Sequence, residues 1–448
     1  MNAVIIVLDT GRRDHLGCYG YHRNTSPNID KLAAQGTLFT RCYATDVPTL
    51  PSFTTLLSGR KGIITGRVSF NPTEAPPFQG SFMPGDAPWL AEVLGRNGYT
   101  TAAVSTLFHM GTYFPRGFRY YLNPMAGVRE RTQTVNADEI NALALPWLAQ
   151  HHKEQFFLFV HYWDPHVESV WGKPSPPERY VLPEGFKNPF YKGTPKDLTE
   201  REYIVSQYDA NIAFADKHIG DLLKAIDDYG IANDTLVVLI ADHGENLGED
   251  HPLGKAIWDH LDIHEPVVHI PLIIRHPGGM GVKRVEAMVQ NVDIPATILH
   301  FLGVPVPESY NGIDLLPLIR GETKEGYPEV YTETGFYTCK RALITDDGWK
   351  LLKSVDNGPY KGAPTTELYD LNTDPDEVNT LAEVETERLN RLELRMLRWL
   401  EKNLGNRPDP LRLRAHMGMV GPLVPFYGYV HVSRERGRIY TATPEEGR

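Results

Sequence analysis

Cysteine is scarce in this chain of 448 residues, which carries three: Cys18, Cys42 and Cys339. An odd number of widely spaced cysteines argues against a disulfide framework. Long apolar runs are also missing, since no stretch approaches the roughly 18 residues that a membrane-spanning helix needs. The chain begins Met1-Asn2-Ala3 and enters a strand at once, without the basic stretch of a secretory leader. We therefore expect a cytoplasmic protein that does not bind a membrane.

The chain also lacks an excess of basic residues. It has 45 Lys and Arg against 56 Asp and Glu, which gives a net charge of −11. Proteins that bind nucleic acids or anionic membranes present basic surfaces, so we expect neither partner. A small anionic substrate is compatible with this charge, because a bound metal ion can invert the charge locally.

One stretch combines a buried strand with groups that bind metals. Six apolar residues, 236–241, run directly into Asp242-His243-Gly244-Glu245. In open α/β sheets, ligands bind just outside the carboxyl ends of the strands. A carboxylate oxygen beside an imidazole nitrogen is half of a coordination shell for a divalent metal. The alternative is an Asp242 that caps a helix, followed by a histidine in a turn.

A second apolar run, residues 3–8, also ends in an acid, Asp9. The two acids can meet only if the sheet makes their strands neighbours. Between them lies Thr49, just before a turn set by Pro51 and at the start of a helical segment. Taken alone, Thr49 is explained better as a helix N-cap than as a nucleophile.

The pattern of elements predicts three regions. Residues 1–325 alternate apolar strands with helices, which indicates an α/β catalytic domain. Residues 326–404 contain short alternating strands and one helix, typical of a small antiparallel sheet subdomain. Residues 405–448 show no clear period and are expected to form an extended tail, through which the chain can form a homo-oligomer.

Several segments, in order, resemble the sulfatase family of the alkaline phosphatase superfamily. They cover about residues 1–380 and lie at 9–20, 25–33, 49–60, 161–166, 242–248, 291–297 and 367–375. The resemblance implies an α/β fold with a large mixed, mostly parallel sheet flanked by helices and a smaller C-terminal antiparallel subdomain. It also strengthens the metal interpretation of the Asp242-His243 pair.

Three positions depart from the family pattern. The family's nucleophile is a cysteine or serine that is converted to formylglycine, and here that position is Thr49. The arginine four positions later is Phe53, and the second aspartate of the family's first pair is Thr10. These changes make the chain more similar to phosphodiesterases, phosphonate monoester hydrolases, lipoteichoic acid synthases and phosphoethanolamine transferases, several of which use threonine as nucleophile.

The resemblance implies one divalent metal ion (Mn²⁺, Zn²⁺ or Ca²⁺) bound by four residues, with three further catalytic residues beside it. The metal shell would be Asp9, Thr49, Asp242 and His243. Lys255 and His166 are similar in placement to residues that contact the substrate oxygens and the leaving group, and His260 to a histidine of a later family segment. We expect supporting or structural roles for Arg12, Asp164, His251, His264 and His269.

The first functional hypothesis is a metal-dependent hydrolase of phosphate or phosphonate esters that acts through a phosphothreonine on Thr49. The alternative is a sulfatase that works without formylglycine, and a third interpretation is a non-catalytic relative. A formylglycine diol can expel sulfate by collapsing to the aldehyde, whereas a threonine sulfate has no such exit. For this reason the sequence favours phosphorus over sulfur.

Overall fold

The computed structural model describes most of the chain. The described residues are 1–69, 87–125, 135–166, 182–191, 201–249, 258–260, 262–277, 281, 283–336, 338–358, 362–417, 430–432 and 439–441. Within them, no helix has the length and apolar character to cross a bilayer.

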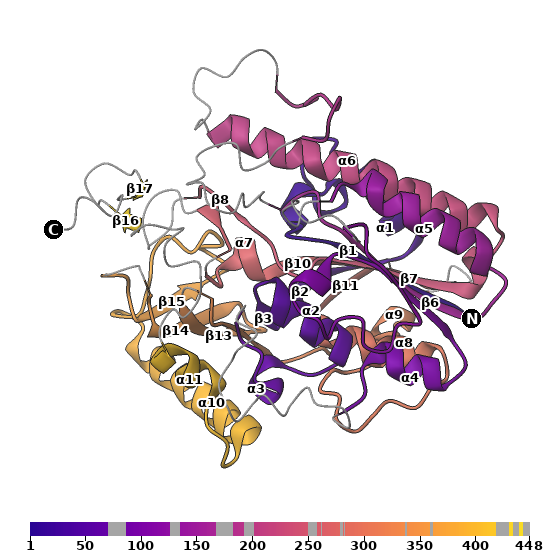
Figure 1. Ribbon diagram of the computed structural model, residues 1–448. Coiled ribbons are helices and arrows are strands. Elements are labelled where there is room, and N and C mark those ends of the chain that lie inside the picture. Colours follow the sequence, from indigo (N-terminus) through magenta and orange to yellow (C-terminus); the bar gives the residue numbers. More distant parts are fainter. Residues whose placement is uncertain are drawn as a thin grey trace.

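An eight-stranded sheet forms the centre of the molecule (Figure 1). Its strands are β1 (Asn2–Leu8), β2 (Thr37–Tyr43), β4 (Thr100–Val104), β5 (Tyr120–Leu122), β6 (Phe156–Tyr162), β7 (Thr235–Ile240), β10 (His269–Arg275) and β11 (Arg284–Gln290). The spatial order is β11-β2-β10-β7-β1-β6-β4-β5. Only β10 pairs antiparallel with its two neighbours, and the other described pairs are parallel. The predicted mixed, mostly parallel sheet is therefore confirmed.

Helices cover both faces of this sheet. On one face lie α1 (Pro27–Gln35), α5 (Ala137–His151) and α6 (Arg201–Asp228); on the other lie α2 (Thr49–Ser58), α4 (Leu90–Arg96), α8 (Ile294–Phe301) and α9 (Leu316–Arg320). Side chains alternate along β1, so Val4 and Ile6 pack toward the first group while Ile5 and Val7 pack toward the second. Burial on both faces explains why β1 and β7 are uninterrupted apolar runs.

The strand register brings distant residues to one edge. Val7 of β1 lies opposite His161 of β6 and opposite Ile240 of β7. The residues that follow these strands, Asp9 and Asp242, therefore emerge beside each other at the carboxyl edge. Strands β1 and β7, which must be neighbours for the two acids to meet, pair directly in the sheet.

A second sheet has the order β15 (Thr366–Asp370), β14 (Trp349–Asp356), β13 (Cys339–Thr345), β12 (Glu329–Thr334) and β3 (Asp46–Val47). The first four strands pair antiparallel, and α10 (Thr386–Leu404) packs on them. Strand β3 pairs parallel with β12 and lies immediately before α2. One strand of this sheet thus comes from outside the predicted range 326–404.

Helix α11 (Pro410–Met417) lies in the range expected to be an extended tail. Asp409 accepts a hydrogen bond from the backbone of Leu411 and pairs with Arg341 of β13. Tertiary contacts therefore support a helix that the periodicity did not predict. The remaining α-helices and strands of the described residues are α3 (Gly62–Thr65), α7 (Glu265–Val268), β8 (Asn246–Leu247), β9 (Trp258–Asp259), β16 (Val430–Val432) and β17 (Ile439–Thr441).

Candidate functional site

Three buried side chains converge at the carboxyl edge of the central sheet. One ligand atom from each of Asp9, Asp242 and His243 lies within 4.8 Å of the others. In each of the two carboxylates, one oxygen is held by hydrogen bonds from the protein. Asp242 Oδ1 accepts the backbone N–H groups of Thr10 and His243, at 3.1 and 2.9 Å. Asp9 Oδ1 and Asp242 Oδ2 have no hydrogen-bond partner among the described residues.

The histidine of this cluster also directs a lone pair inward. His243 Nδ1 lies 2.8 Å from the carbonyl oxygen of Gly244, to which it donates its proton. Its Nε2 therefore carries a lone pair, and it lies 3.3 Å from Asp242 Oδ2. Two acceptors at this distance repel each other unless a proton or a cation lies between them. The mixed oxygen and nitrogen donors fit a divalent cation.

The pKa values of the three side chains also fit a site for a divalent cation. Burial and the neighbouring charges of Asp242 and Glu245 raise the pKa of Asp9 well above its usual range. Burial raises the pKa of Asp242 to about 7 and lowers that of His243 well below its usual range. The imidazole is thus neutral, as a metal ligand must be, and the two carboxylates gain a stable partner when a cation binds.

Thr49 is the first residue of α2, and Pro48 occupies the N-cap position. The N-cap explanation of Thr49 is therefore wrong. The Thr49 hydroxyl lies 3.1 Å from His243 Nε2 instead. Ser52, one turn further along, donates a hydrogen bond of 2.7 Å to the carbonyl of Asp242. This bond fixes the start of α2 against the end of β7.

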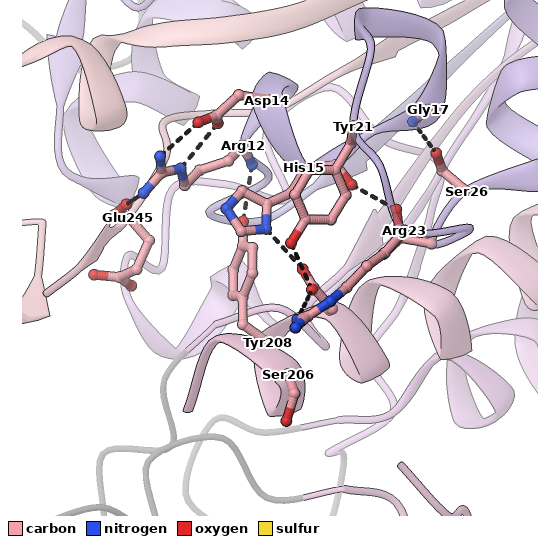
Figure 2. Close-up of polar contacts among 12 residues, drawn as sticks. Arg12, Asp14, His15, Gly17, Tyr21, Arg23, Ser26, Ser206, Tyr208 and Glu245 are labelled. Carbon is pink, nitrogen blue, oxygen red and sulfur yellow. Dashed lines mark hydrogen bonds and ion pairs between the residues drawn. The ribbon is translucent and has the colours of Figure 1, made fainter. Parts of the chain in front are cut away.

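The loop after β1 is held by a polar network (Figure 2). The Arg12 guanidinium binds the Asp14 carboxylate and the Glu245 carbonyl oxygen, at 2.6 and 3.0 Å. The Tyr208 hydroxyl accepts from the Arg12 backbone N–H and donates to the Thr10 carbonyl. Figure 2 shows His15, Tyr21 and Arg23 side by side next to this network, and all three bind the carboxylate of Asp209. Arg12 therefore has the supporting role that the sequence predicts.

His161 is a site residue for which no role was predicted from the sequence. Its Nε2 lies 2.8 Å from Asp9 Oδ2, and its Nδ1 lies 3.2 Å from the Ser105 hydroxyl. Burial, with a smaller effect from His166, lowers the pKa of His161 to about 3, so the ring is neutral. The Phe53 ring packs on it with centroids 4.7 Å apart. The available signal was a histidine at the end of a buried apolar run.

Two predicted catalytic histidines lie beside the cluster. The His260 ring lies 4.5 Å from that of His243 and 5.5 Å from that of His166. The His260 Nδ1 lies 3.4 Å from a carboxylate oxygen of the buried Glu245. The other predicted residues of this loop, Lys255 and His251, lie outside the described residues.

The remaining residues expected to be structural make contacts away from the cluster. Asp164 accepts the backbone N–H of Ala137 at the start of α5. His269 lies 2.8 Å from a Glu265 oxygen, and His264 lies 3.3 Å from a Glu367 oxygen.

A cavity of about 900 Å³ lies next to the site, between the two sheets. Arg12, Glu249 and His269 line it from the main domain, and Asp346 and Asp376 from the small sheet. Its lining contains none of Asp9, Thr49, Asp242 and His243. This cavity is therefore separate from the cluster.

The fold and the site define an α/β protein with a buried cluster suited to a divalent cation and a hydroxyl beside it. The comparisons place it more closely. The family model described as Sulfatase matches residues 1–304, and the one described as N-sulphoglucosamine sulphohydrolase, C-terminal, matches residues 254–403. The chain belongs to the sulfatase family.

Relatives and neighbours agree with this assignment. The chain is 23% identical over 429 residues to arylsulfatase K of Xenopus laevis, covering 83% of this chain and 77% of that protein. It is 23% identical over 428 residues to a Δ4,5-hexuronate-2-O-sulfatase of Bacteroides thetaiotaomicron, covering 85% and 84%. A phosphonate monoester hydrolase structure from Agrobacterium radiobacter superimposes with a TM-score of 0.69, at 21% identity, covering 99% and 100%. At that identity the structural likeness shows the fold alone.

Proposed function

We propose that the chain is a metal-dependent hydrolase that cleaves a sulfuric ester of a small anionic substrate at the site of Asp9, Thr49, Asp242 and His243. The observation that carries the proposal is a buried set of inward-facing lone pairs beside the Thr49 hydroxyl. The named relatives support sulfuric esters, since two of them are called sulfatases. They favour the alternative of the sequence analysis over its first hypothesis.

Asp9, Asp242 and His243 would hold one divalent cation, with the Thr49 oxygen as a fourth ligand. A cation in that place lowers the pKa of a bound hydroxyl and offsets negative charge in the transition state. The imidazole donor favours Mn²⁺ or Zn²⁺ over Ca²⁺, which prefers oxygen ligands alone.

The side chains around the cation position can supply the nucleophile, the proton donor and the base of the reaction. The Thr49 hydroxyl would lose its proton to solvent and its oxygen would attack sulfur, while the bond from sulfur to the ester oxygen breaks and His166 donates a proton to the departing alcohol. Water would then give up a proton and attack the sulfur of the threonine ester, and the departing Thr49 oxygen would take up a proton, which releases sulfate and restores the hydroxyl. His260, held by Glu245, is the candidate base for that water. Lys255 remains a predicted contact of the substrate oxygens.

One observation favours a second candidate function, the hydrolysis of phosphate or phosphonate esters. Residue 49 is a threonine and cannot become an aldehyde, so its sulfate ester has no exit by collapse. The first function therefore requires that water displaces the side-chain oxygen at sulfur, whereas in-line displacement at phosphorus is the general route of phosphoryl transfer and fits a phosphothreonine directly. A phosphonate monoester hydrolase shares the fold over the whole chain.

Paired substrates test the two functions. The metal-free protein is reconstituted with Mn²⁺, Zn²⁺ or Ca²⁺ and assayed on p-nitrophenyl sulfate, p-nitrophenyl phosphate and the p-nitrophenyl ester of phenylphosphonate. Faster turnover of the sulfate supports the first function, and faster turnover of a phosphorus ester supports the second. No turnover with any metal supports the non-catalytic interpretation.

Thr49→Ala should reduce kcat by at least about a thousandfold, since removing a nucleophile has effects of that order or larger. Thr49→Ser keeps the hydroxyl and should retain most activity. Mass spectrometry of protein quenched during turnover should find the adduct on residue 49. Undiminished turnover by Thr49→Ala would show that another group attacks.

A further inference from the structure

The two carboxylates of the cluster are supported in different ways. Backbone N–H groups hold Asp242 Oδ1, so its position follows from the main chain. Asp9 Oδ2 accepts its bond from a side chain, His161, at 2.8 Å. The orientation of Asp9 therefore depends on a residue that lies 152 positions away in the sequence.

The proton positions in this second arrangement can be assigned from the acceptors. Asp9 is an acceptor when ionised, so His161 Nε2 carries the proton. The Ser105 hydroxyl accepts the backbone N–H of Leu107 at 3.1 Å and lies 3.2 Å from His161 Nδ1. The Tyr121 hydroxyl also hydrogen-bonds Ser105 and itself accepts the Phe108 N–H, so when Tyr121 donates to Ser105 the serine proton is available to Nδ1. The chain of donors runs from Leu107 through Ser105 and His161 to Asp9.

We propose that His161 is the positioning residue of Asp9: its Nε2–H holds Oδ2, so that Oδ1 faces the cation, and Ser105 fixes the tautomer that makes this possible. The inference rests on the proposed metal site and names a determinant of its affinity. A ligand that is held before the metal arrives loses less freedom on binding. Loss of such outer hydrogen bonds weakens metal binding by about 10- to 100-fold.

The fold supports this role. His161 is the sixth residue of β6, and β6 pairs with β1 in register up to Leu8, directly before Asp9. The Phe53 ring packs against the imidazole, and the Trp163 ring lies 5.1 Å from it on another side. The ring is therefore confined, and its nitrogens can point only where the strand and these neighbours direct them.

Calorimetric titration of the metal-free full chain with Mn²⁺ tests the proposal. His161→Phe removes the donor and should weaken Mn²⁺ binding by about 10- to 100-fold. His161→Gln supplies an amide N–H at a similar distance and should recover most of the affinity. Ser105→Ala leaves the tautomer unfixed and should fall between the wild type and His161→Phe.

Tyr162→Phe is the matched control. Tyr162 follows His161 on the same strand, is equally buried, and donates a hydrogen bond of 2.7 Å to Asn141 on the opposite face of the sheet. This variant should lower the melting temperature without changing Mn²⁺ affinity. A merely structural role of His161 predicts the same behaviour for both positions.

A measurement on the unmodified protein covers the case in which His161→Phe does not fold. Nitrogen-15 NMR of histidine-labelled protein loaded with Zn²⁺, which keeps Asp9 ionised, should show His161 as the neutral Nε2–H tautomer. An Nδ1–H tautomer, or wild-type Mn²⁺ affinity in His161→Phe while Asp9→Asn has lost binding, would overturn the inference alone. If the wild type binds none of Mn²⁺, Zn²⁺ and Ca²⁺, the proposed function falls with it.

Discussion

Gly244 follows the Asp242-His243 pair, and there is no room beside it for a side chain. A Cβ atom built there would lie 2.0 Å from the carbonyl oxygen of Pro266. The Gly244 N–H donates to the Val267 carbonyl at 2.7 Å, and its own carbonyl accepts from His243. The close approach of two backbones thus sets the direction of the His243 ring.

Gly244→Ala should therefore disturb the site as well as the fold. We expect a loss of about 1–3 kcal/mol in the free energy of unfolding, as for other overpacked sites, together with weaker Mn²⁺ binding. Chemical denaturation and metal titration measure the two effects. Gly95→Ala, in helix α4, is the control: a Cβ atom there would make only an ordinary contact, 3.9 Å from the Gly117 carbonyl oxygen, and the substitution should be neutral or stabilising. Unchanged metal affinity in a destabilised Gly244→Ala would contradict the link between this glycine and His243.

Phe53 shows what occupies the position where the family resemblance implies an arginine. Its ring is fully buried and packs against Phe159 and His161, with centroids 6.0 and 4.7 Å away. An aromatic contact has thus replaced a charge on this side of the site. The departure at position 53 is visible in the sequence, but the contacts of Phe53 depend on how α2 packs against the sheet.

Single residues in the sequence were enough to predict the candidate metal ligands. They were not enough to predict the side chains that hold these ligands in place. Asp9 and Asp242 stand out because each ends an uninterrupted apolar run. His161 also ends such a run, but its partner depends on β6 lying beside β1, and strand order cannot be read from local pattern. Ser105 gave no signal, because a serine after a short strand is ordinary.

At the scale of elements, helix α7 and the small sheet share a set of buried charges. The ammonium group of Lys350 on β14 lies 3.0 Å from Glu265 and 2.9 Å from Glu377. His264, the residue before α7, lies between Asp262 and Glu367 of β15, at 3.2 and 3.3 Å. Burial alone would lower the pKa of His264, but the carboxylates of Asp262 and Glu377 and two hydrogen bonds raise it to about 9.

This raised pKa predicts a pH dependence of stability. The protonated imidazole stabilises the folded state fully below the unfolded pKa of about 6.5, and the contribution is lost as the pH rises to about 9. The full contribution corresponds to roughly 3 kcal/mol. Denaturant unfolding at several pH values should show this fall in the wild type and a smaller one in His264→Gln. Equal slopes in the two proteins would show that His264 does not carry the charge.

Elements were predictable where they are long and apolar. The apolar runs 3–8 and 236–241 became β1 and β7, within one residue of the expected ranges at each end. The direction of β10, which opposes its neighbours, and the helix α11 were not predicted, because both depend on tertiary contacts. The strand β3 has two residues, too few for any periodicity.

At the scale of the molecule, β3 links the two sheets. It pairs with β12 through Asp46 and Val47, and α2 with Thr49 at its start follows two residues later. The buried Lys350 and Glu265 pair crosses the same boundary. The small sheet is thus attached to the main domain through residues close to the site.

We therefore expect the whole chain to unfold in one transition, and a chain cut after residue 325 not to fold. The cut removes the partner strand of β3 and the cation that neutralises Glu265. Scanning calorimetry of the full chain and circular dichroism of the fragment measure both. Two resolved transitions, or a fragment that unfolds cooperatively, would instead show that residues 1–325 form an independent unit.

The position of β3 also limits how related enzymes can be recombined. A hybrid that exchanges only the C-terminal segment would combine four strands from one parent with a fifth from the other. That mismatched strand ends one residue before Pro48 and two before Thr49. Crossover designs that aim to change substrate preference by exchanging this sheet must therefore carry residues 46 and 47 from the same parent.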